Sequence, residues 1–510
     1  MLARTLAYGL NGVSGFAVTV EAYAAPGLPA LDIIGLPDAS VKESRDRVDA
    51  AIRHSGFTMP VAKLVVNLAP ADRKKEGPAF DLPIAVAVLV ASGQLECVDA
   101  TSTLLLGELS LDGTLQPVRG ALPMVISASE AGVRAVILPA GNAEEVACIQ
   151  GIRVYPARSL SEVAGHLRGR EPIPTQEQRA YHDLLQAASP MVDLSQVQGQ
   201  TGAKRALEIA AAGGHNMLMV GVPGSGKTML ARCLPGILPP MTFEEALETT
   251  RIHSIAGKLP AGGGLMVTRP FRTPHHSASM ASLIGGGANA LPGEVSLAHN
   301  GVLFLDELPE FDKKALEALR QPLEDGLVSV SRVRSQAQYQ SGFMLVASMN
   351  PCPCGYYGSK QRACRCGQHE IRRYLDRVSG PMLDRIDIQI EVDAVPVKEI
   401  IGGGAAESSA VVAGRVSKAR AIQQERYRQE GIHCNAQLDA RLTDRYCALT
   451  DEAAQVLHMA VERMSMSRRA YGRVLKVART IADLAGDEHI ATAHVAEAIQ
   501  YRELDGKYWR

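Results

Sequence analysis

The chain lacks a long apolar run and an excess of charge of either sign. Its longest apolar stretch, Leu82 to Ala91, is too short for a membrane-spanning helix, which needs about 20 residues. The opening segment Met1–Tyr8 contains one arginine and no sustained apolar run, so no secretory signal is expected. With a net charge of −1, the chain would have to hold a nucleic-acid partner by local basic groups. We therefore expect a cytoplasmic protein.

No disulfide framework is expected, because thiols stay reduced in a cytoplasmic protein. Of nine cysteines, four fall between Cys352 and Cys366. The others are scattered and are expected to be reduced, buried, small apolar residues: Cys97, Cys148, Cys233, Cys434 and Cys447. Hydrophobic residues make up 46% and charged residues 21% of the 510 residues. This composition is typical of a globular protein, and the length predicts about three domains.

A glycine-rich segment carries the strongest motif. A short apolar run, Met217–Val220, is followed by Gly-Val-Pro-Gly-Ser-Gly-Lys-Thr and then by a helix-like run. Strand, loop and helix in this order are typical of a phosphate-binding P-loop, where backbone N–H groups cradle phosphate oxygens. Lys227 is expected to bind the β- and γ-phosphates of ATP and Thr228 to bind Mg²⁺. The predicted nucleotide-binding residues are Gly221, Val222, Pro223, Gly224, Ser225, Gly226, Lys227 and Thr228.

Two later apolar runs end in polar residues that complete an ATPase site. The run Gly301–Leu305 predicts a buried parallel strand that ends in Asp306 and Glu307. We expect Asp306 to hold Mg²⁺ and Glu307 to orient and deprotonate the attacking water. A third strand, Phe343–Met349, ends in Asn350, which can hold that water against the γ-phosphate.

Three other positions extend this site. Arg385, just before another predicted strand, is interpreted as an arginine finger for the neighbouring subunit, because a planar guanidinium binds phosphate oxygens bidentately. The alternative is a salt bridge to Asp384 or Asp387. Gly199 and Gln200, ahead of the P-loop, are candidates for one wall of the adenine pocket.

These motifs identify an AAA+ ATPase, and longer stretches resemble the magnesium-chelatase-like AAA+ proteins of the ComM/YifB family. The stretches that carry the resemblance are residues 269–287, 292–308 and 350–358. The resemblance implies a ring, with six copies expected, and ATP-driven translocation on DNA, including branch migration during integration of transforming DNA. It also places Arg469 at the sensor-2 position of a helical lid, with the adjacent Arg468 as the alternative.

The N-terminal region alternates strand-like and helix-like runs, which predicts an α/β domain. Residues 67–85 and 107–122 resemble the proteolytic domain of Lon-type proteases. That family places a nucleophilic serine where this chain has Ala79 and a lysine where it has Leu122. Neither alkyl side chain can attack a peptide or accept a proton, so the resemblance implies the fold without its catalytic dyad. A basic run, Arg73 to Lys75, is either a docking or DNA-contacting patch or a solvated loop.

DNA contact is predicted at a second place. Residues 327–340 read as two strands around a polar turn and look like the pre-sensor hairpin of helicase-type AAA+ proteins. Arg332 and Arg334 are two residues apart and would share one face of the hairpin. Repeated around a ring, such arginines would give a multi-charge DNA site; the alternative is a pair of ordinary surface arginines. His275 and His276 lie in a glycine-rich stretch expected to form a mobile insertion, and metal binding by them is disfavoured for want of a third ligand.

Two Cys-x-Cys-Gly units predict a structural zinc site. Four thiolates can close a tetrahedral Zn²⁺ site and leave no position for water or substrate, although free thiols are the alternative. The predicted ligands are Cys352, Cys354, Cys364 and Cys366.

The predicted fold class is therefore α/β, with an AAA+ P-loop core and a helical C-terminal lid behind a Lon-protease-like domain that lacks the dyad. The expected divisions are residues 1–168 for the Lon-like domain, 169–190 for a linker, 191–400 for the ATPase core and 401–510 for the lid. The predicted function is an ATP-driven, ring-shaped DNA motor. Two other functions stay open: the motor subunit of a metal-chelatase complex and a nucleotide-gated scaffold or chaperone.

Overall fold

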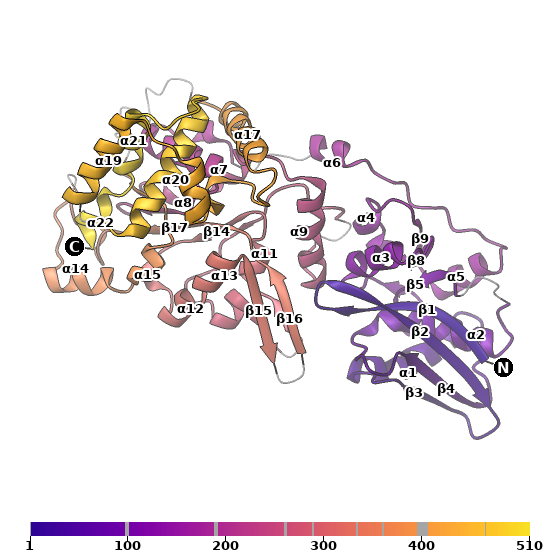
Figure 1. The fold of residues 1–510 in the computed structure, drawn as a ribbon. Coiled ribbons are helices and arrows are strands. Elements are labelled where there is room, and N and C mark those ends of the chain that lie inside the picture. Colours follow the sequence, from indigo (N-terminus) through magenta and orange to yellow (C-terminus); the bar gives the residue numbers. More distant parts are fainter. Residues whose placement is uncertain are drawn as a thin grey trace. The chain divides into compact units, whose positions relative to one another are not determined.

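The computed structural model describes residues 2–96, 101–187, 192–259, 263–287, 290–332, 335–359, 362–394, 406–464 and 466–509. The chain divides into two compact units, shown in Figure 1 and described separately here. The first comprises Met1–Ala187, Thr242–Val267 and Ser331–Tyr339, and the second comprises Ala188–Met241, Thr268–Val330 and Gln340–Arg510.

A seven-stranded mixed sheet forms the core of the first unit, with the strand order β3-β4-β2-β1-β5-β8-β9. Its strands are β1 (Leu2–Asn11), β2 (Ser14–Ala25), β3 (Ala30–Ile34), β4 (Lys63–Ala69), β5 (Thr103–Leu105), β8 (Ala135–Pro139) and β9 (Arg153–Ala157). Its main helices are α1 (Ala39–His54), α2 (Asp81–Ala91), α3 (Ala121–Glu130) and α5 (Leu160–Leu167). Because α2 is apolar on nearly all sides, it is buried almost throughout its length.

One helix of the first unit comes from the middle of the chain. Helix α9 (Phe243–Ile255) begins with a capping box formed by Thr242 and Glu245. It packs against α3, and the Ser254 carbonyl accepts a hydrogen bond from the backbone N–H of Gly120, 3.3 Å away. The first unit is therefore built from segments that lie far apart in the sequence.

The second unit contains a five-stranded parallel sheet with the order β11-β14-β17-β10-β18. The strands are β10 (Met217–Val220), β11 (Phe271–Arg272), β14 (Val302–Leu305), β17 (Met344–Met349) and β18 (Ile388–Glu391). The three central strands, β10, β14 and β17, are buried at every position, as expected for a parallel sheet covered on both faces. Their carboxyl ends meet at one edge, because Val220 pairs with Met349 and Leu305 pairs with Ala347.

Helices cover this sheet, and two of the C-terminal helices, α17 (Ser409–Arg426) and α20 (Arg468–Ala485), pack on α7 (Thr201–Gly213). Figure 1 shows the C-terminal helices in orange and yellow. The helices of the second unit include α7 (Thr201–Gly213), α8 (Lys227–Cys233), α17 (Ser409–Arg426), α18 (Ala440–Tyr446), α19 (Asp451–Arg463), α20 (Arg468–Ala485), α21 (Thr492–Gln500) and α22 (Glu503–Tyr508). A buried polar contact joins α7 to α20, since His215 at the end of α7 lies 2.7 Å from the Thr480 hydroxyl. No helix among the described residues is long and apolar enough to cross a membrane.

The predicted α/β class is confirmed, and the differences concern particular segments. The glycine-rich stretch expected to form an insertion instead supplies β11, whose Phe271 pairs with Val302 at the edge of the core sheet. The region predicted to be a linker, residues 169–190, contains a short helix, α6 (Tyr181–Ala187). The scattered cysteines are buried as predicted at Cys148, Cys233, Cys434 and Cys447, while Cys97 lies outside the described residues.

Candidate nucleotide-binding site

The P-loop connects β10 to α8 at the carboxyl edge of the parallel sheet. Gly224 and Gly226 have φ values of +78° and +89°, which favour glycine. Gly221 is fixed by space: a Cβ there would lie 2.2 Å from the carbonyl oxygen of Val392. The three glycines of the predicted motif are therefore required by backbone conformation and by close packing.

Lys227 begins α8 and is largely buried. Its Nζ donates hydrogen bonds to the carbonyl oxygens of Gly221 (2.7 Å) and Val222 (3.0 Å) and to Asn350 Oδ1 (3.4 Å). Burial lowers the pKa of Lys227, and the nearby carboxylates of Asp306 and Glu307 oppose that shift. The sequence-predicted residues Lys227 and Asn350, 123 positions apart, thus meet at one point.

Asp306 lies directly beyond β14 and joins two neighbouring segments. Its Oδ2 accepts a hydrogen bond from the Thr228 hydroxyl (2.9 Å). Its Oδ1 accepts one from the backbone N–H of Glu307 (3.1 Å) and another from the Ser348 hydroxyl. The structure therefore brings together the two predicted Mg²⁺ ligands, a hydroxyl and a carboxylate, which are donor types that Mg²⁺ uses in ATPase sites.

Ser348 was missed by sequence reasoning. It is a fully buried hydroxyl in the otherwise apolar strand β17, one residue before Met349. A polar residue inside an apolar strand is the signal that could have found it, because a buried hydroxyl needs a hydrogen-bond partner.

Glu307 is exposed and adopts a left-handed backbone conformation, with φ of +54°. Its Oε2 lies 3.6 Å from Nδ1 of His276, whose ring lies beside that of His275, with 4.1 Å between centroids and 34° between the ring planes. Among the described residues these histidines belong to no cluster of potential metal ligands. The pair therefore faces the predicted catalytic carboxylate.

Gln200, a candidate for one wall of the adenine pocket, lies next to the P-loop. Its Nε2 donates to the carbonyl oxygens of Ser225 (3.3 Å) and Asp393 (2.5 Å). It also lines a cavity of about 600 Å³ together with Ile390 and Tyr501, whereas Gly199 is not among the lining residues.

The two predicted arginines lie elsewhere. Arg385 donates to the carbonyl oxygen of Pro381 (2.5 Å) and pairs with Glu324. Arg469, exposed over 71% of its side chain, lies 3.4 Å from Asp384. Within the described part of the chain, neither forms a hydrogen bond or ion pair with residues 221–228.

A half-buried neighbour, Arg473, lies one helical turn beyond Arg469. Its guanidinium is 3.5 Å from Asp387 and 3.7 Å from Asp384, and burial lowers its pKa. Sequence reasoning did not select Arg473. Its spacing of four residues from Arg469 places both on one face of α20.

The four clustered cysteines converge just beyond Asn350. The Sγ of Cys352 lies 3.4 Å from that of Cys354 and 3.6 Å from that of Cys364, and all four Sγ atoms lie within 4.8 Å of one another. Tetrahedral Zn–S bonds of about 2.3 Å require sulfur separations of about 3.8 Å, so the donor set fits Zn²⁺. Backbone N–H groups of Arg365 and Tyr356 lower the pKa of Cys354, whereas burial raises the pKa of Cys352 and Cys366.

The Lon-like positions contain no nucleophile. Ala79 and Leu122 are both buried. The basic run is broken up as well: Lys75 is buried, and its Nζ donates to the carbonyl oxygens of Arg73 (2.8 Å) and Pro70. The three basic residues 73–75 therefore do not form one exposed patch.

The predicted DNA-contacting hairpin is formed by β15 (Leu327–Arg332) and β16 (Ser335–Gln340). Arg334 lies outside the described residues, and so does the side chain of Arg332.

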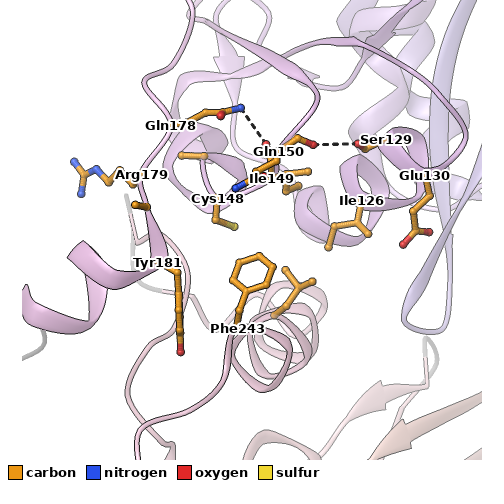
Figure 2. A pocket seen from close by; sticks show the side chains of 13 residues that line it. Ile126, Ser129, Glu130, Cys148, Ile149, Gln150, Gln178, Arg179, Tyr181 and Phe243 are labelled. Carbon is orange, nitrogen blue, oxygen red and sulfur yellow. Dashed lines mark hydrogen bonds between the residues drawn. The ribbon is translucent and has the colours of Figure 1, made fainter.

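A separate cavity of about 710 Å³ lies within the first unit (Figure 2). Residues from α3, α9 and the segment 178–181 line it, and the rings of Tyr181 and Phe243 meet edge to face at 5.6 Å. None of the predicted site residues is among those that line it.

Comparison with known families supports the motif analysis. Three family models match the chain: "Magnesium chelatase, subunit ChlI" at residues 193–400, "Subunit ChlI of Mg-chelatase" at 20–142 and "Magnesium chelatase, subunit ChlI C-terminal" at 406–502.

Individual relatives match nearly the whole length. The YifB protein of Salmonella typhimurium is 44% identical over 496 residues, which are 97% of this chain and 96% of YifB. The competence protein ComM of Haemophilus influenzae is 44% identical over 495 residues, with the same coverage. Lon protease 2 of Bacillus subtilis is 24% identical over 190 residues, 34% of this chain and 33% of the protease.

Proposed function

Because the chain belongs to the magnesium-chelatase-like AAA+ family that includes YifB and ComM, we propose that it is an ATP-driven, ring-shaped DNA motor. In this proposal six copies form the ring, and ATP hydrolysis drives helicase or branch-migration steps on recombination intermediates. The DNA is single-stranded, branched or duplex, and the process is natural transformation or homologous recombination. The printed name of ComM, a competence protein, supports this assignment.

The observation that carries the ATPase part is the convergence of Lys227, Thr228 and Asp306 beside the P-loop. Thr228 and Asp306 would hold Mg²⁺, which when bound neutralises charge on the phosphates. Lys227 would exchange its carbonyl partners for phosphate oxygens. Glu307 would take the proton from the attacking water, and Asn350 would orient that water.

Two arginines complete the proposed site. Arg385, which does not contact its own P-loop, would act on the nucleotide of the adjacent copy, and Arg469 would act as sensor 2 from the lid. An arginine finger supplied in trans is worth about 10³- to 10⁵-fold in turnover.

The domain organisation follows the same proposal. Residues 1–168 form a Lon-like domain without protease activity, residues 169–190 a linker, residues 191–400 the motor core and residues 401–510 the lid. The buried side chains of Ala79 and Leu122 support the loss of proteolysis. The four clustered cysteines would hold structural Zn²⁺, and the sulfur separations support this ligand set.

DNA-stimulated ATPase activity tests the proposal. We expect DNA to raise ATP hydrolysis, and purified protein to move a Holliday junction or a three-stranded substrate only when ATP is hydrolysed. The double change Arg332→Ala and Arg334→Ala should weaken DNA binding and make it less sensitive to salt. If DNA does not change the rate of ATP hydrolysis and the double variant binds DNA normally, the protein is not a DNA motor. Hydrolysis without a DNA effect would favour a chelatase subunit or a scaffold.

A further inference from the structure

The cysteine cluster lies against the P-loop. Gly355, between the two Cys-x-Cys units, has φ of +84° and packs on the ring of Pro223 in the P-loop. A Cβ at Gly355 would lie 2.6 Å from Pro223 Cδ and 2.7 Å from Pro223 Cγ. Only a glycine backbone fits this contact, so the position of the cysteine loop limits where the phosphate-binding loop can lie.

The cluster also lies next to Asn350. Cys352 follows Asn350 by two residues, and Asn350 contacts Lys227 through its side chain. Within the cysteine loop, a Cβ at Gly355 would also lie 3.9 Å from Asn350 Cγ, so the loop packs beside this side chain. Cross-linking the cysteines would therefore fix the residue that faces the Lys227 ammonium.

The cysteine loop needs a cross-link to keep this shape. Residues 350–359 and 362–367 contain no helix or strand, and three of the four cysteines are partly exposed. Backbone N–H groups of Tyr357 and Cys366 point at the Sγ atoms of Cys352 (3.3 Å) and Cys364 (3.4 Å), as expected around metal-bound thiolates. A structural Zn²⁺ supplies folding free energy to such segments.

We propose that the four-cysteine cluster is a zinc-dependent brace for nucleotide binding: zinc fixes Gly355 against Pro223 and Asn350 against Lys227, so that zinc loading sets ATP affinity. This inference rests on the proposed ATPase site and not on the proposed action on DNA. It assigns to the zinc site an effect on ATP binding in addition to its effect on local folding.

The test compares zinc content with the affinity for a fluorescent ATP analogue, without DNA. Wild type should contain one Zn²⁺ per chain. Gly355→Ala should retain zinc but bind the analogue about tenfold more weakly or worse, because its methyl group overpacks Pro223. Gly358→Ala is the matched control: Gly358 has a similar φ of +77° in the same loop, but a Cβ there meets nothing within 4 Å. It should retain both zinc and affinity.

A second pair of measurements keeps the test independent of how Gly355→Ala folds. Cys354→Ser should lose zinc and weaken analogue binding while the circular dichroism spectrum stays close to that of wild type. Lys227→Ala should lose analogue binding and keep its zinc. Wild type without zinc, unchanged affinity in Cys354→Ser, or equal effects of the two glycine changes would each overturn the brace. If zinc-loaded wild type binds no nucleotide, the proposed ATPase function fails instead.

Discussion

Asp306 accepts hydrogen bonds from two different segments. Changes at Asp306 and at its partner Ser348 should therefore affect ATP hydrolysis to different extents. The Thr228 hydroxyl reaches one oxygen and the Ser348 hydroxyl the other. We expect Asp306→Asn to reduce ATP turnover at least about 10²-fold, because the Mg²⁺ ligand is lost. Ser348→Ala removes one supporting hydrogen bond, worth about 1 kcal/mol, and should cost no more than about fivefold. Steady-state hydrolysis at several Mg²⁺ concentrations checks this: excess Mg²⁺ should rescue Ser348→Ala and not Asp306→Asn.

A second contact between single residues joins Glu307 to His276, which lies in the segment that follows β11. Removing the ring in His276→Ala should free the carboxylate, so we expect basal hydrolysis to rise, by no more than about fivefold because exposed contacts of this kind contribute at most about 1 kcal/mol. Affinity for ATP should not change. His275→Ala is the control, because it removes the ring beside His276 but not the contact between His276 and Glu307. Slower hydrolysis in His276→Ala would mean that the contact positions Glu307 for reaction instead of restraining it.

The local motifs were predictable, whereas contacts set by strand pairing were not. Residues 217–228 contain strand, turn and helix signals within one short segment, and the structure has all three. The contact between Asp306 and Ser348 depends on the register that pairs Leu305 with Ala347, which the sequence of neither strand specifies. The neighbourhood of Asn350 and Lys227 could be inferred only from the rule that parallel strands share a carboxyl edge.

At the scale of elements, helix α9 shows why one helix was missed. Its buried residues include Thr249, Thr250, His253 and Ser254, so the apolar period that predicts a packed helix is absent. Only the capping box of Thr242 and Glu245 signals its start. The polar residues can be buried because they find partners outside the helix: the Thr250 hydroxyl accepts a hydrogen bond from the backbone N–H of Met266, 2.9 Å away. Burial of α9 thus depends on tertiary contacts that the segment's own pattern does not reveal.

The contact between Ser254 of α9 and the buried Glu145 predicts that stability depends on pH. The buried carboxylate of Glu145 accepts hydrogen bonds from the Ser254 hydroxyl, the Leu122 N–H (3.1 Å) and the Asn142 amide (3.1 Å). Burial raises its pKa despite these bonds. The folded state therefore binds this proton more tightly than the unfolded state, whose pKa is about 4.3.

The stabilising contribution of this proton is complete below about pH 4.3 and is lost as pH rises through the folded pKa. The free energy of unfolding of wild type, relative to Glu145→Gln, should therefore fall by up to about 1.4 kcal/mol per pH unit across that window. Urea denaturation of both proteins at a series of pH values measures the difference. A difference that is constant with pH would contradict the prediction.

At the scale of the whole molecule, the proposed nucleotide site takes Arg385 from a neighbouring copy. Arg385 is only 10% exposed in its side chain and is held by Pro381 and Glu324, without a bond to the P-loop. A finger supplied to a neighbouring copy is the arrangement that gives this arginine a role in hydrolysis. Assembly and turnover should then be linked, and ATPase activity should rise more steeply than protein concentration where the ring dissociates.

Mixing two inactive variants tests that link directly. Lys227→Ala should abolish nucleotide binding but leave Arg385 intact, whereas Arg385→Ala should bind nucleotide and lose about 10³-fold or more in hydrolysis. In a mixed ring, a site with an intact P-loop from the second variant can receive Arg385 from the first. Hydrolysis should therefore reappear on mixing and depend on the ratio of the two variants. A mixture of Lys227→Ala with Asp306→Asn is the control, because both changes damage the same half-site and no complete site can form. If mixed rings form, as shown by co-purification of differently tagged copies, and still do not hydrolyse ATP, Arg385 does not act across the subunit boundary.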